Sequence, residues 1–439
     1  MSTPPHTAIS CCALTALASA QDYTILTPPC PLVSDSCPEG GGQFGHRVLV
    51  LDFDGDGAQD VAVAEPGQDA VHVFLGPDFA NPTVVSFEPE GFFTGCPHGP
   101  GDFFGASLAA GELDGVPGDE IVIGATRARG GRGEIHIYSK TRLLRRLSSW
   151  RPGVTAFGTG VAVGDLDRDG SPDLAVGAGR SDVGGVVSVG TVHVFSSLLT
   201  TERIIVNPGF AQGLGYRGQY GQKLKVDDVD GDGWLDLIVS AQGNAQVGAP
   251  FAGAVYVHPS PVIAPAGVAV PAPLRLDDPN VVPCDFGPRY GKGFDARDGM
   301  VAVSAQRKEP LGWTCPGGQQ EDSGAAFLFS GAGLSNVQQV SDASPSHLGL
   351  FGFDVSLVDL LGDSTPDLAV ISIDDRDVHV WESADLSQPP VIVPMPPGAA
   401  YWAFGVDRGD VDPSDAHEEL MLGDPRADNC AGRVVILGL

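Results

Sequence analysis

Four carboxylates, two glycines and an apolar run follow one another in the segment DFDGDGAQDVAVAEP, residues 52–66. The aspartates fall at positions 1, 3, 5 and 9 of a loop, a spacing that gathers hard oxygen ligands of the kind Ca²⁺ prefers. An EF-hand would place a bidentate Glu at position 12, where this sequence has Val63, and the residues after the loop alternate as in a strand. The segment therefore predicts a calcium cage between two β-strands.

The same loop recurs along the chain in complete and incomplete forms. Thiolate and imidazole ligands, which favour zinc, are absent from the complete loops, so Ca²⁺ is the predicted ion. For a single copy, a polar turn whose Asp side chains accept bonds from nearby backbone amides is the alternative. The complete loops carry Asp52, Asp54, Asp56 and Asp60; Asp165, Asp167, Asp169 and Asp173; and Asp228, Asp230, Asp232 and Asp236. Weaker candidates retain Glu112, Asp114 and Glu120 in a second loop, Asp359, Asp363 and Asp367 in a sixth, and Asp410 and Asp412 in a seventh, whereas the shortened fifth loop is expected to be empty.

An aromatic-Gly pair marks seven repeated units that must position these loops. Each pair precedes a strand, an acidic loop, an apolar strand and a third strand, and a fourth strand follows in most units. The seventh unit lacks a fourth strand, but an unassigned strand at residues 22–28 precedes the first unit. The sequence thus predicts an all-β, seven-bladed β-propeller of four-stranded blades, closed by the N-terminal strand completing the last blade. The pairs are Phe44-Gly45, Phe104-Gly105, Phe157-Gly158, Tyr220-Gly221, Tyr290-Gly291, Phe351-Gly352 and Phe404-Gly405.

Composition and charge narrow the class of protein. Sixty glycines and 36 prolines disfavour long helices; the basic stretch at 140–147 fits either a helix or a strand, and the outer strand of the second unit is predicted at 145–150. A net charge of −30 argues against nucleic-acid binding and against docking on anionic lipid. No run approaches the roughly 20 apolar residues of a membrane span, so membrane insertion is not expected.

The combination of aromatic-Gly pairs, DxDxDGxxD loops and the apolar-Gly-Ala strands after them resembles the FG-GAP repeat family. The chain is similar to the ligand-binding N-terminal β-propeller of integrin α subunits, and the resemblance covers residues 22–439. It implies that the calcium loops lie on one face of the ring. It also implies that ligands meet the opposite face, which is made by the connections from second to third strands and from each blade to the next.

The connections assigned to this ligand face are rich in basic residues. Guanidinium groups there would make bidentate contacts with carboxylate or sulfate groups, and Phe92, Phe93 and Trp313 would add aromatic contact area. Ordinary solvated loops are the alternative interpretation. The candidate ligand-face residues are Arg127, Arg129, Arg132, Arg180, Arg307 and Lys308.

The N-terminal segment 1–20 resembles a secretory signal peptide, because a short apolar stretch ends in Ala18-Ser19-Ala20. The remaining residues, 21–439, then form a single FG-GAP/integrin-α-like propeller domain in a secreted, extracellular protein. Loss of the signal leaves six cysteines, an even number that suits an oxidising compartment. We expect a disulfide between Cys284 and Cys315, while the pairing of Cys30, Cys37, Cys96 and Cys430 stays open.

The sequence carries no GxSxG, HExxH or phosphate-loop motif, assigns no catalytic residue and does not decide whether the chain is an enzyme. The leading hypothesis is a secreted, calcium-stabilised adhesion or recognition module for an extracellular protein or polysaccharide, an anionic one if the basic loops bind it. A polysaccharide lyase or other glycan-degrading enzyme on a calcium-binding propeller is the alternative, with Lys308 or Tyr290 as its base; a spacer without a ligand is the third. Equivalent third-strand histidines, His72, His136, His193 and His379, are expected to be structural, because different blades hold them too far apart to share a metal.

Overall fold

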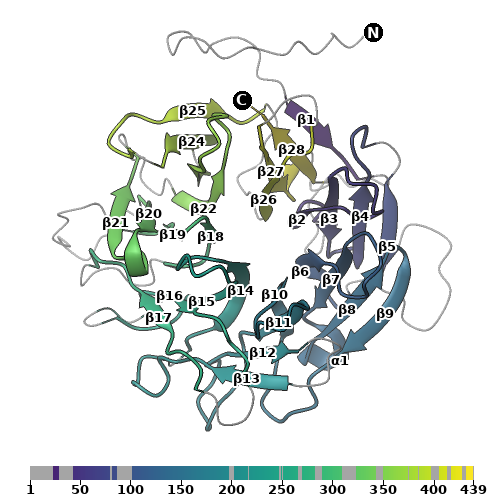
Figure 1. Cartoon of the computed structure of the whole chain (residues 1–439), viewed down its shortest axis with the longest axis vertical. Coiled ribbons are helices and arrows are strands. Elements are labelled where there is room, and N and C mark those ends of the chain that lie inside the picture. Colours follow the sequence, from purple (N-terminus) through teal and green to yellow (C-terminus); the bar gives the residue numbers. More distant parts are fainter. Residues whose placement is uncertain are drawn as a thin grey trace.

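Seven four-stranded antiparallel sheets stand in a ring around a central axis in a computed structural model of the chain (Figure 1). The predicted seven-bladed β-propeller is confirmed. The structure describes residues 23–28, 43–79, 82–86, 101–196, 202–215, 217–246, 249, 251–264, 269–281, 289–308, 323–342, 350–373, 375–383, 385–396, 405–412, 417–427 and 432–438.

Each blade runs from an inner strand beside the axis to an outer strand at the rim. Blade one consists of β2 (Arg47–Leu51), β3 (Asp60–Glu65), β4 (Ala70–Phe74) and β5 (Thr83–Ser86). Blade two consists of β6 (Phe104–Gly111), β7 (Glu120–Ala125), β8 (Glu134–Ser139) and β9 (Arg142–Leu147). Blade three consists of β10 (Phe157–Gly164), β11 (Asp173–Ala178), β12 (Thr191–Phe195) and β13 (Glu202–Val206). Blade four consists of β14 (Tyr220–Asp227), β15 (Asp236–Ala241), β16 (Ala254–His258) and β17 (Leu274–Leu276).

The remaining blades follow the same plan, and the last one joins the two ends of the chain. Blade five consists of β18 (Phe294–Arg297), β19 (Met300–Ala305), β20 (Ala325–Ser330) and β21 (Asn336–Val340). Blade six consists of β22 (Phe351–Val358), β23 (Asp367–Ser372), β24 (Asp377–Glu382) and β25 (Val391–Pro394). Blade seven consists of β26 (Gly405–Gly409), β27 (Glu419–Asp424), β28 (Arg433–Leu437) and, from the N-terminal end, β1 (Tyr23–Leu26).

The ring closes where β1 pairs with β28, in register from Tyr23 opposite Leu437 to Leu26 opposite Val434. This pairing confirms the prediction that the N-terminal strand completes the last blade. Hydrogen bonds between the two ends of the chain thereby hold the first and seventh blades in one ring, and they cover an edge of β28 that would otherwise be open to pairing with other chains.

The hydrophobic core lies between neighbouring blades rather than at the axis. Each of the seven apolar clusters combines side chains of two adjacent blades. The second strand of a blade has neighbours on both of its faces, so β3, β7, β11 and β15 are buried at every position. Their small and β-branched residues suit a strand that packs on both sides.

In blades two, three, four and six the aromatic-Gly pair opens the inner strand, and its glycine has a positive φ. Gly158 has a φ of 90°, and a Cβ at this position would lie 3.0 Å from Glu134 O of the preceding blade. The adjoining Phe157 is 1% exposed and forms an isolated parallel bridge with Gly133 of that blade. The pair therefore brings two neighbouring blades into close contact, and the glycine position leaves no room for a side chain.

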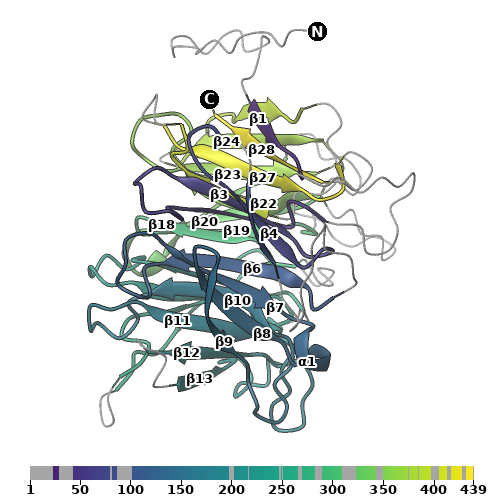
Figure 2. The same cartoon turned by 90° about the vertical axis from the view of Figure 1, so that its right-hand side faces the viewer.

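The helical elements whose bounds lie within the described part of the chain are the short turns α1 (Ala128–Gly131) and η3 (Ala332–Leu334). The ambiguous basic stretch is strand β9, which begins three residues before the predicted 145–150 because only Lys140 and Thr141 separate it from β8. From the side, α1 projects from one end of the ring (Figure 2). Among the described residues, no helix combines the length and the apolar character that crossing a membrane requires.

Candidate metal centres and the opposite face

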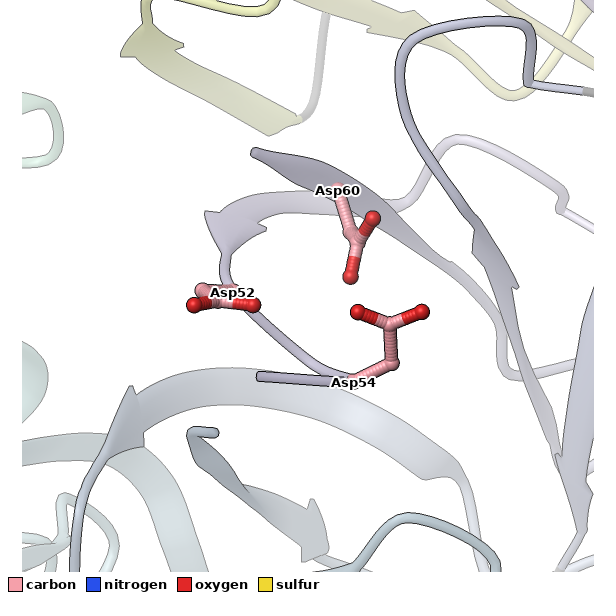
Figure 3. A group of neighbouring side chains, drawn as sticks. All are labelled: Asp52, Asp54 and Asp60. Atoms are coloured by element: carbon pink, nitrogen blue, oxygen red, sulfur yellow. The ribbon is translucent and has the colours of Figure 1, made fainter. Parts of the chain in front are cut away.

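Three acidic loops bring carboxylates together at the same place in blades one, three and four. Each loop joins the inner strand to the second strand, and in each the oxygen ligands at positions 1, 3 and 9 lie within 4.8 Å of one another. In blade one, the carboxylates of Asp54 and Asp60 face each other across the loop, with Asp52 beside them (Figure 3). The three groups are Asp52, Asp54 and Asp60; Asp165, Asp167 and Asp173; and Asp228, Asp230 and Asp236.

The aspartate at position 1 of each loop shapes the backbone. Asp52 Oδ1 accepts a hydrogen bond from Gly55 N at 2.8 Å, and its Oδ2 accepts one from Gly57 N at 3.1 Å. Asp165 and Asp228 accept the equivalent bonds in their own loops. Local side-chain to backbone bonds of this kind favour a tight turn over strand pairing, so the loops are ordered by their own carboxylates.

The aspartate at position 9 opens the second strand and is fixed more rigidly than the others. Asp60 is 1% exposed, and its Oδ2 accepts a bond from Phe53 N at 2.8 Å. Its Oδ1 accepts one from Gly76 N at 2.8 Å. In blade four, Asp236 accepts from Val229 N at 3.2 Å and Ser260 N at 3.0 Å. Each cluster thus has one ligand anchored in the sheet.

Burial and mutual repulsion make these carboxylates reluctant to ionise together. Burial, with Asp230 and Asp232 nearby, raises the pKa of Asp236 to about 6. Burial is also the main cause that raises the pKa of Asp60 and of Asp167, and neighbouring loop aspartates add to it. A divalent cation among the oxygens would reverse this effect by neutralising the charges. The all-oxygen donor set and its close grouping therefore fit a hard cation such as Ca²⁺.

The position-5 aspartates do not belong to these groups. Asp56, Asp169 and Asp232 instead accept bonds from backbone amides two residues on, at 2.8, 2.8 and 3.0 Å. Asp232 also pairs with Arg168 of blade three, with 2.7 Å between the nitrogen and the oxygen. The structure therefore brings together three of the four predicted ligands in each complete loop.

Contacts between neighbouring blades brace the loops, and no sequence pattern predicts these contacts. Asp119 of the second loop accepts a bond from Asp52 N at 2.9 Å and donates its own amide to Asp52 O at 2.7 Å. Lys140 Nζ donates to Asp54 O at 3.0 Å. These partners are separated by 67 and 86 residues, so only the ring geometry brings them together.

The incomplete loops keep the backbone plan without forming a three-carboxylate group within the described residues. Glu120 Oε2 accepts bonds from Leu113 N and Asp114 N at 2.6 and 3.0 Å, and Glu112 belongs to none of the three carboxylate groups. In the sixth loop, Asp359 Oδ1 accepts from Gly362 N at 2.8 Å, and Asp363 accepts from Thr365 N at 2.9 Å. In the seventh loop, residues 413–416 lie outside the described part of the chain.

Asp367, at position 9 of the sixth loop, is a buried carboxylate in a loop that lacks one of the four acidic ligands. Its Oδ1 is buried and has no hydrogen-bond partner in the described part of the chain. Burial, with Asp363 and Asp359 nearby, raises the pKa of Asp367 to about 7. Leu361 occupies position 3 of this loop, so two carboxylates accompany Asp367 where the complete loops have three.

Comparison with known proteins identifies the repeat. A sequence model of the FG-GAP repeat matches residues 44–80, 157–195 and 220–258, which are the blades that carry the three complete loops. The chain therefore contains FG-GAP repeats. The same three blades thus carry both the strongest family signal and the three carboxylate groups.

The relatives of this FG-GAP protein include integrin α chains. It is 30% identical over 160 residues to integrin alpha-5 of Xenopus laevis, which covers 34% of this chain and 15% of the relative. It is 26% identical over 255 residues to integrin alpha-PS2 of Drosophila melanogaster, which covers 53% of this chain and 18% of the relative. The matched region is therefore a small part of each relative, and the chain resembles that part alone.

Solved structures confirm the architecture of the FG-GAP propeller. A streptogramin B lyase structure superposes with a TM-score of 0.54 over 95% of this chain and 98% of the lyase chain. Sequence identity between the two is 10%. At this identity the likeness concerns the fold alone, since one fold hosts many unrelated functions.

On the face of the FG-GAP propeller opposite the metal loops, five of the six candidate residues are exposed. Arg129 lies in α1, and its Nε is 2.6 Å from Glu134 Oε2. The guanidinium of Arg127 lies over the ring of Phe103, 4.5 Å from its centroid. The exposed residues are Arg127, Arg129, Arg132, Arg180 and Arg307.

Lys308 corrects the predicted ligand face. Its side chain is 2% exposed, and its Nζ lies 2.8 Å from Asp278 Oδ2 and 2.5 Å from Asn280 O. The ammonium therefore belongs to a buried ion pair rather than to the surface. Tyr290, the other residue suggested as a base, is fully buried, and burial raises the pKa of its hydroxyl well above the usual value. Neither side chain is placed to act on a polysaccharide.

Several sequence predictions concern residues outside the described part of the chain. These are the signal peptide at 1–20, the aromatic residues Phe92, Phe93 and Trp313, and the cysteines, including the expected Cys284–Cys315 disulfide.

Proposed function

We propose that this protein is a secreted, calcium-stabilised recognition module that binds a protein or polysaccharide on the face opposite its acidic loops. The observation that carries the proposal is the recurrence of one all-carboxylate group at the same place in three blades. An FG-GAP propeller similar to integrin α chains supplies the context. In this proposal residues 1–20 are a signal peptide, and residues 21–439 form the exported domain.

Calcium would be held by the carboxylates at positions 1, 3 and 9 of the complete loops, and it would supply positive charge that cancels their repulsion. The position-9 aspartate ties the site to the second strand, because its oxygens accept bonds from both flanking turns in blades one and four. The position-1 aspartate holds the loop backbone in place before any ion arrives. Such a site stabilises the blades and has no catalytic duty.

The exposed arginines support an acidic ligand on the opposite face. Arg127, Arg129 and Arg132 fall within one short connection of blade two. Guanidinium forks suit carboxylate and sulfate groups. In a chain with a net charge of −30, a local group of arginines would direct an anionic partner to this face.

Binding assays on arrays of extracellular proteins and of neutral and acidic glycans test this function. The purified chain is applied with calcium and with chelator, and each bound glycan is analysed for cleavage. We expect calcium-dependent binding without cleavage, weakened when Arg127, Arg129 and Arg132 are changed to Ala. Changing exposed Arg142 and Arg145 of β9 to Ala removes charge elsewhere and serves as the control. Cleavage would favour the lyase alternative, and silence of a folded, calcium-loaded chain on every array would contradict the proposal.

A further inference from the structure

The arrangement of charged side chains around the central axis differs between its two ends. The inner strands β2, β6, β10, β14, β18, β22 and β26 surround this axis (Figure 1). Toward the acidic loops, cations and carboxylates alternate: Lys225 Nζ lies 2.5 Å from Asp295 Oδ1, and Arg408 Nε lies 3.4 Å from Asp295 Oδ2. Burial would raise the pKa of Asp295, but Lys225 and Arg408 together hold it below its usual value. Both cations of this layer therefore pair with Asp295.

Toward the opposite face, cations converge on a single carboxylate. Arg47, Lys223 and Asp354 each lie three residues after the aromatic residue of their repeat, so they occupy the same level of the axis in blades one, four and six. Lys223 Nζ lies 3.3 Å from Asp354 Oδ1, which it reaches past blade five. Lys292 of blade five joins them, with its Nζ 3.6 Å from the ring centroid of the neighbouring Phe353. We call Arg47, Lys223, Lys292, Asp354 and Gln306 together the axial mouth.

The positive charges of the axial mouth act strongly on one another. Burial, together with Arg289, Arg47 and Lys223, lowers the pKa of Lys292 to about 7, although Asp354 opposes this shift. Burial likewise lowers the pKa of Arg47. Gathering like charges where water is scarce is unfavourable, and an anion placed among them reverses that cost.

A buried hydrogen-bond donor lies in the same place. Gln306 is 1% exposed, and its Oε1 is 3.4 Å from Lys292 Nζ. Its Nε2 is buried and has no hydrogen-bond partner in the described part of the chain. Buried amide donors in folded proteins almost always have an acceptor, so this donor is suited to an oxygen supplied by a ligand.

We propose that the axial mouth binds one anionic group, a carboxylate, sulfate or phosphate, whose oxygens contact Arg47, Lys223 and Lys292 and accept a hydrogen bond from Gln306 Nε2. Ammonium and guanidinium groups provide charge-assisted bonds to such oxygens, and the amide adds a directional one. This site is distinct from the acidic loops and does not depend on calcium. The proposed site is also independent of the recognition function, because either a free anion or an acidic side chain of a partner would fill it.

Calorimetric titration of the full chain with sodium sulfate at pH 6, at constant ionic strength in chloride, tests the proposal. We expect saturable one-to-one binding that weakens at least tenfold in Lys292→Met. The Gln306→Leu variant should weaken it several-fold without any change of charge, which general electrostatic attraction would not do. Arg142→Met removes one exposed charge from β9 and should leave binding unchanged.

A second titration uses a short glutamate-rich peptide in place of sulfate and identifies the source of the anion. Competition between peptide and sulfate would show that the mouth accepts a partner's carboxylate, whereas binding of sulfate alone would assign it to a free ion. Absence of saturable binding by both probes would overturn the proposal. Equal affinities in the wild type, Lys292→Met and Gln306→Leu would overturn it as well, and Lys223→Gln provides a further test if Lys292→Met does not fold.

Discussion

The ring of Phe157 stands edge-on to the imidazole of His193, with centroids 5.3 Å apart and planes inclined by 82°. The imidazole is fully buried, and its Nδ1 lies 2.7 Å from Glu202 Oε1. The same edge-on contact recurs within blades one, two and six, as Phe44–His72, Phe104–His136 and Phe351–His379. The third-strand histidine therefore orients the aromatic residue of its own repeat. This contact accounts for the recurrence of histidine at that position.

A double-mutant cycle should detect this contact as a coupling energy. We expect Phe157→Leu and His193→Gln to destabilise the protein by less together than the sum of their separate effects, by about 1 kcal/mol, because the edge-on contact is lost only once. Chemical denaturation of the four proteins measures the coupling. Phe157→Leu combined with His379→Gln, in different blades, serves as the control and should be additive. Additivity in both cycles would contradict an energetic role for the ring contact.

A side chain at the glycine of the repeat should destabilise the protein. In Gly158→Ala, the new methyl group would lie 3.0 Å from Glu134 O and 3.1 Å from Ile135 Cγ2 at a φ of 90°. Backbone strain of this kind costs about 1 to 3 kcal/mol, and displacement of the neighbouring blade adds to it. Thermal and chemical unfolding measure the loss.

Gly185→Ala provides a matched control for that prediction. Gly185 has a φ of 83°, but nothing lies within 4 Å of its Cβ position. It should therefore lose only the conformational part of the effect. Equal losses in the two variants would show that contact between blades contributes nothing at Gly158.

The repeat made most of the fold predictable from sequence. Seven aromatic-Gly pairs fixed the number of blades, and the spare strand before the first pair predicted the observed pairing of β1 with β28. The carboxylates at positions 1, 3 and 9 also come together as their spacing indicated. These features are local or repeated, so period and residue type are sufficient to predict them.

What the sequence could not predict are contacts made around the ring. Lys308 is predicted to lie on the ligand face because it belongs to a connection from a second to a third strand. It instead folds inward onto Asp278, which lies 30 residues earlier in the chain. Asp119 and Arg168 contact loops of neighbouring blades. Lys223 meets Asp354 across 131 residues. Which charges meet depends on the closure of the ring, and no local pattern encodes it.

Protonation of His258 should lower the free energy of unfolding in weak acid. Burial, with Arg203 nearby, lowers the pKa of His258 to about 4, and its Nε2 lies 2.6 Å from the hydroxyl of Tyr220. The unfolded chain has an ordinary histidine pKa of about 6.5, so between these values the unfolded state binds the proton and the native state does not. The contribution of His258 to the free energy of unfolding is therefore fully present above about pH 6.5. Roughly 3 kcal/mol of it is lost as the pH falls toward 4.

The His258→Gln variant isolates that dependence from the titration of the acidic loops, which both proteins share. Unfolding free energies are measured at several pH values between 4 and 8 in chelator. The difference between wild type and variant should change with pH below 6.5 and stay constant above it. A difference that is constant over the whole range would contradict the assignment to His258.

Calcium should stabilise the chain through three separate sites. A site whose free calcium is ten times its Kd adds about 1.4 kcal/mol to the free energy of unfolding. Chelation should therefore lower the melting temperature, and titration calorimetry should find one equivalent of calcium fewer in each of the variants Asp54→Asn, Asp167→Asn and Asp230→Asn. These position-3 aspartates suit the test because each accepts a local backbone bond, from Asp56 N, Asp169 N and Asp232 N respectively.

Asp385→Asn is the matched control for these calcium variants. Asp385 is exposed and accepts a bond from Ser387 N at 3.0 Å, the same turn geometry as the position-3 aspartates, but it belongs to none of the three carboxylate groups. It should keep the full calcium equivalents and the full thermal shift, since a polar turn alone does not hold the ion. If all four variants retained the wild-type stoichiometry, the carboxylates would be turn-forming residues and the calcium assignment would be wrong.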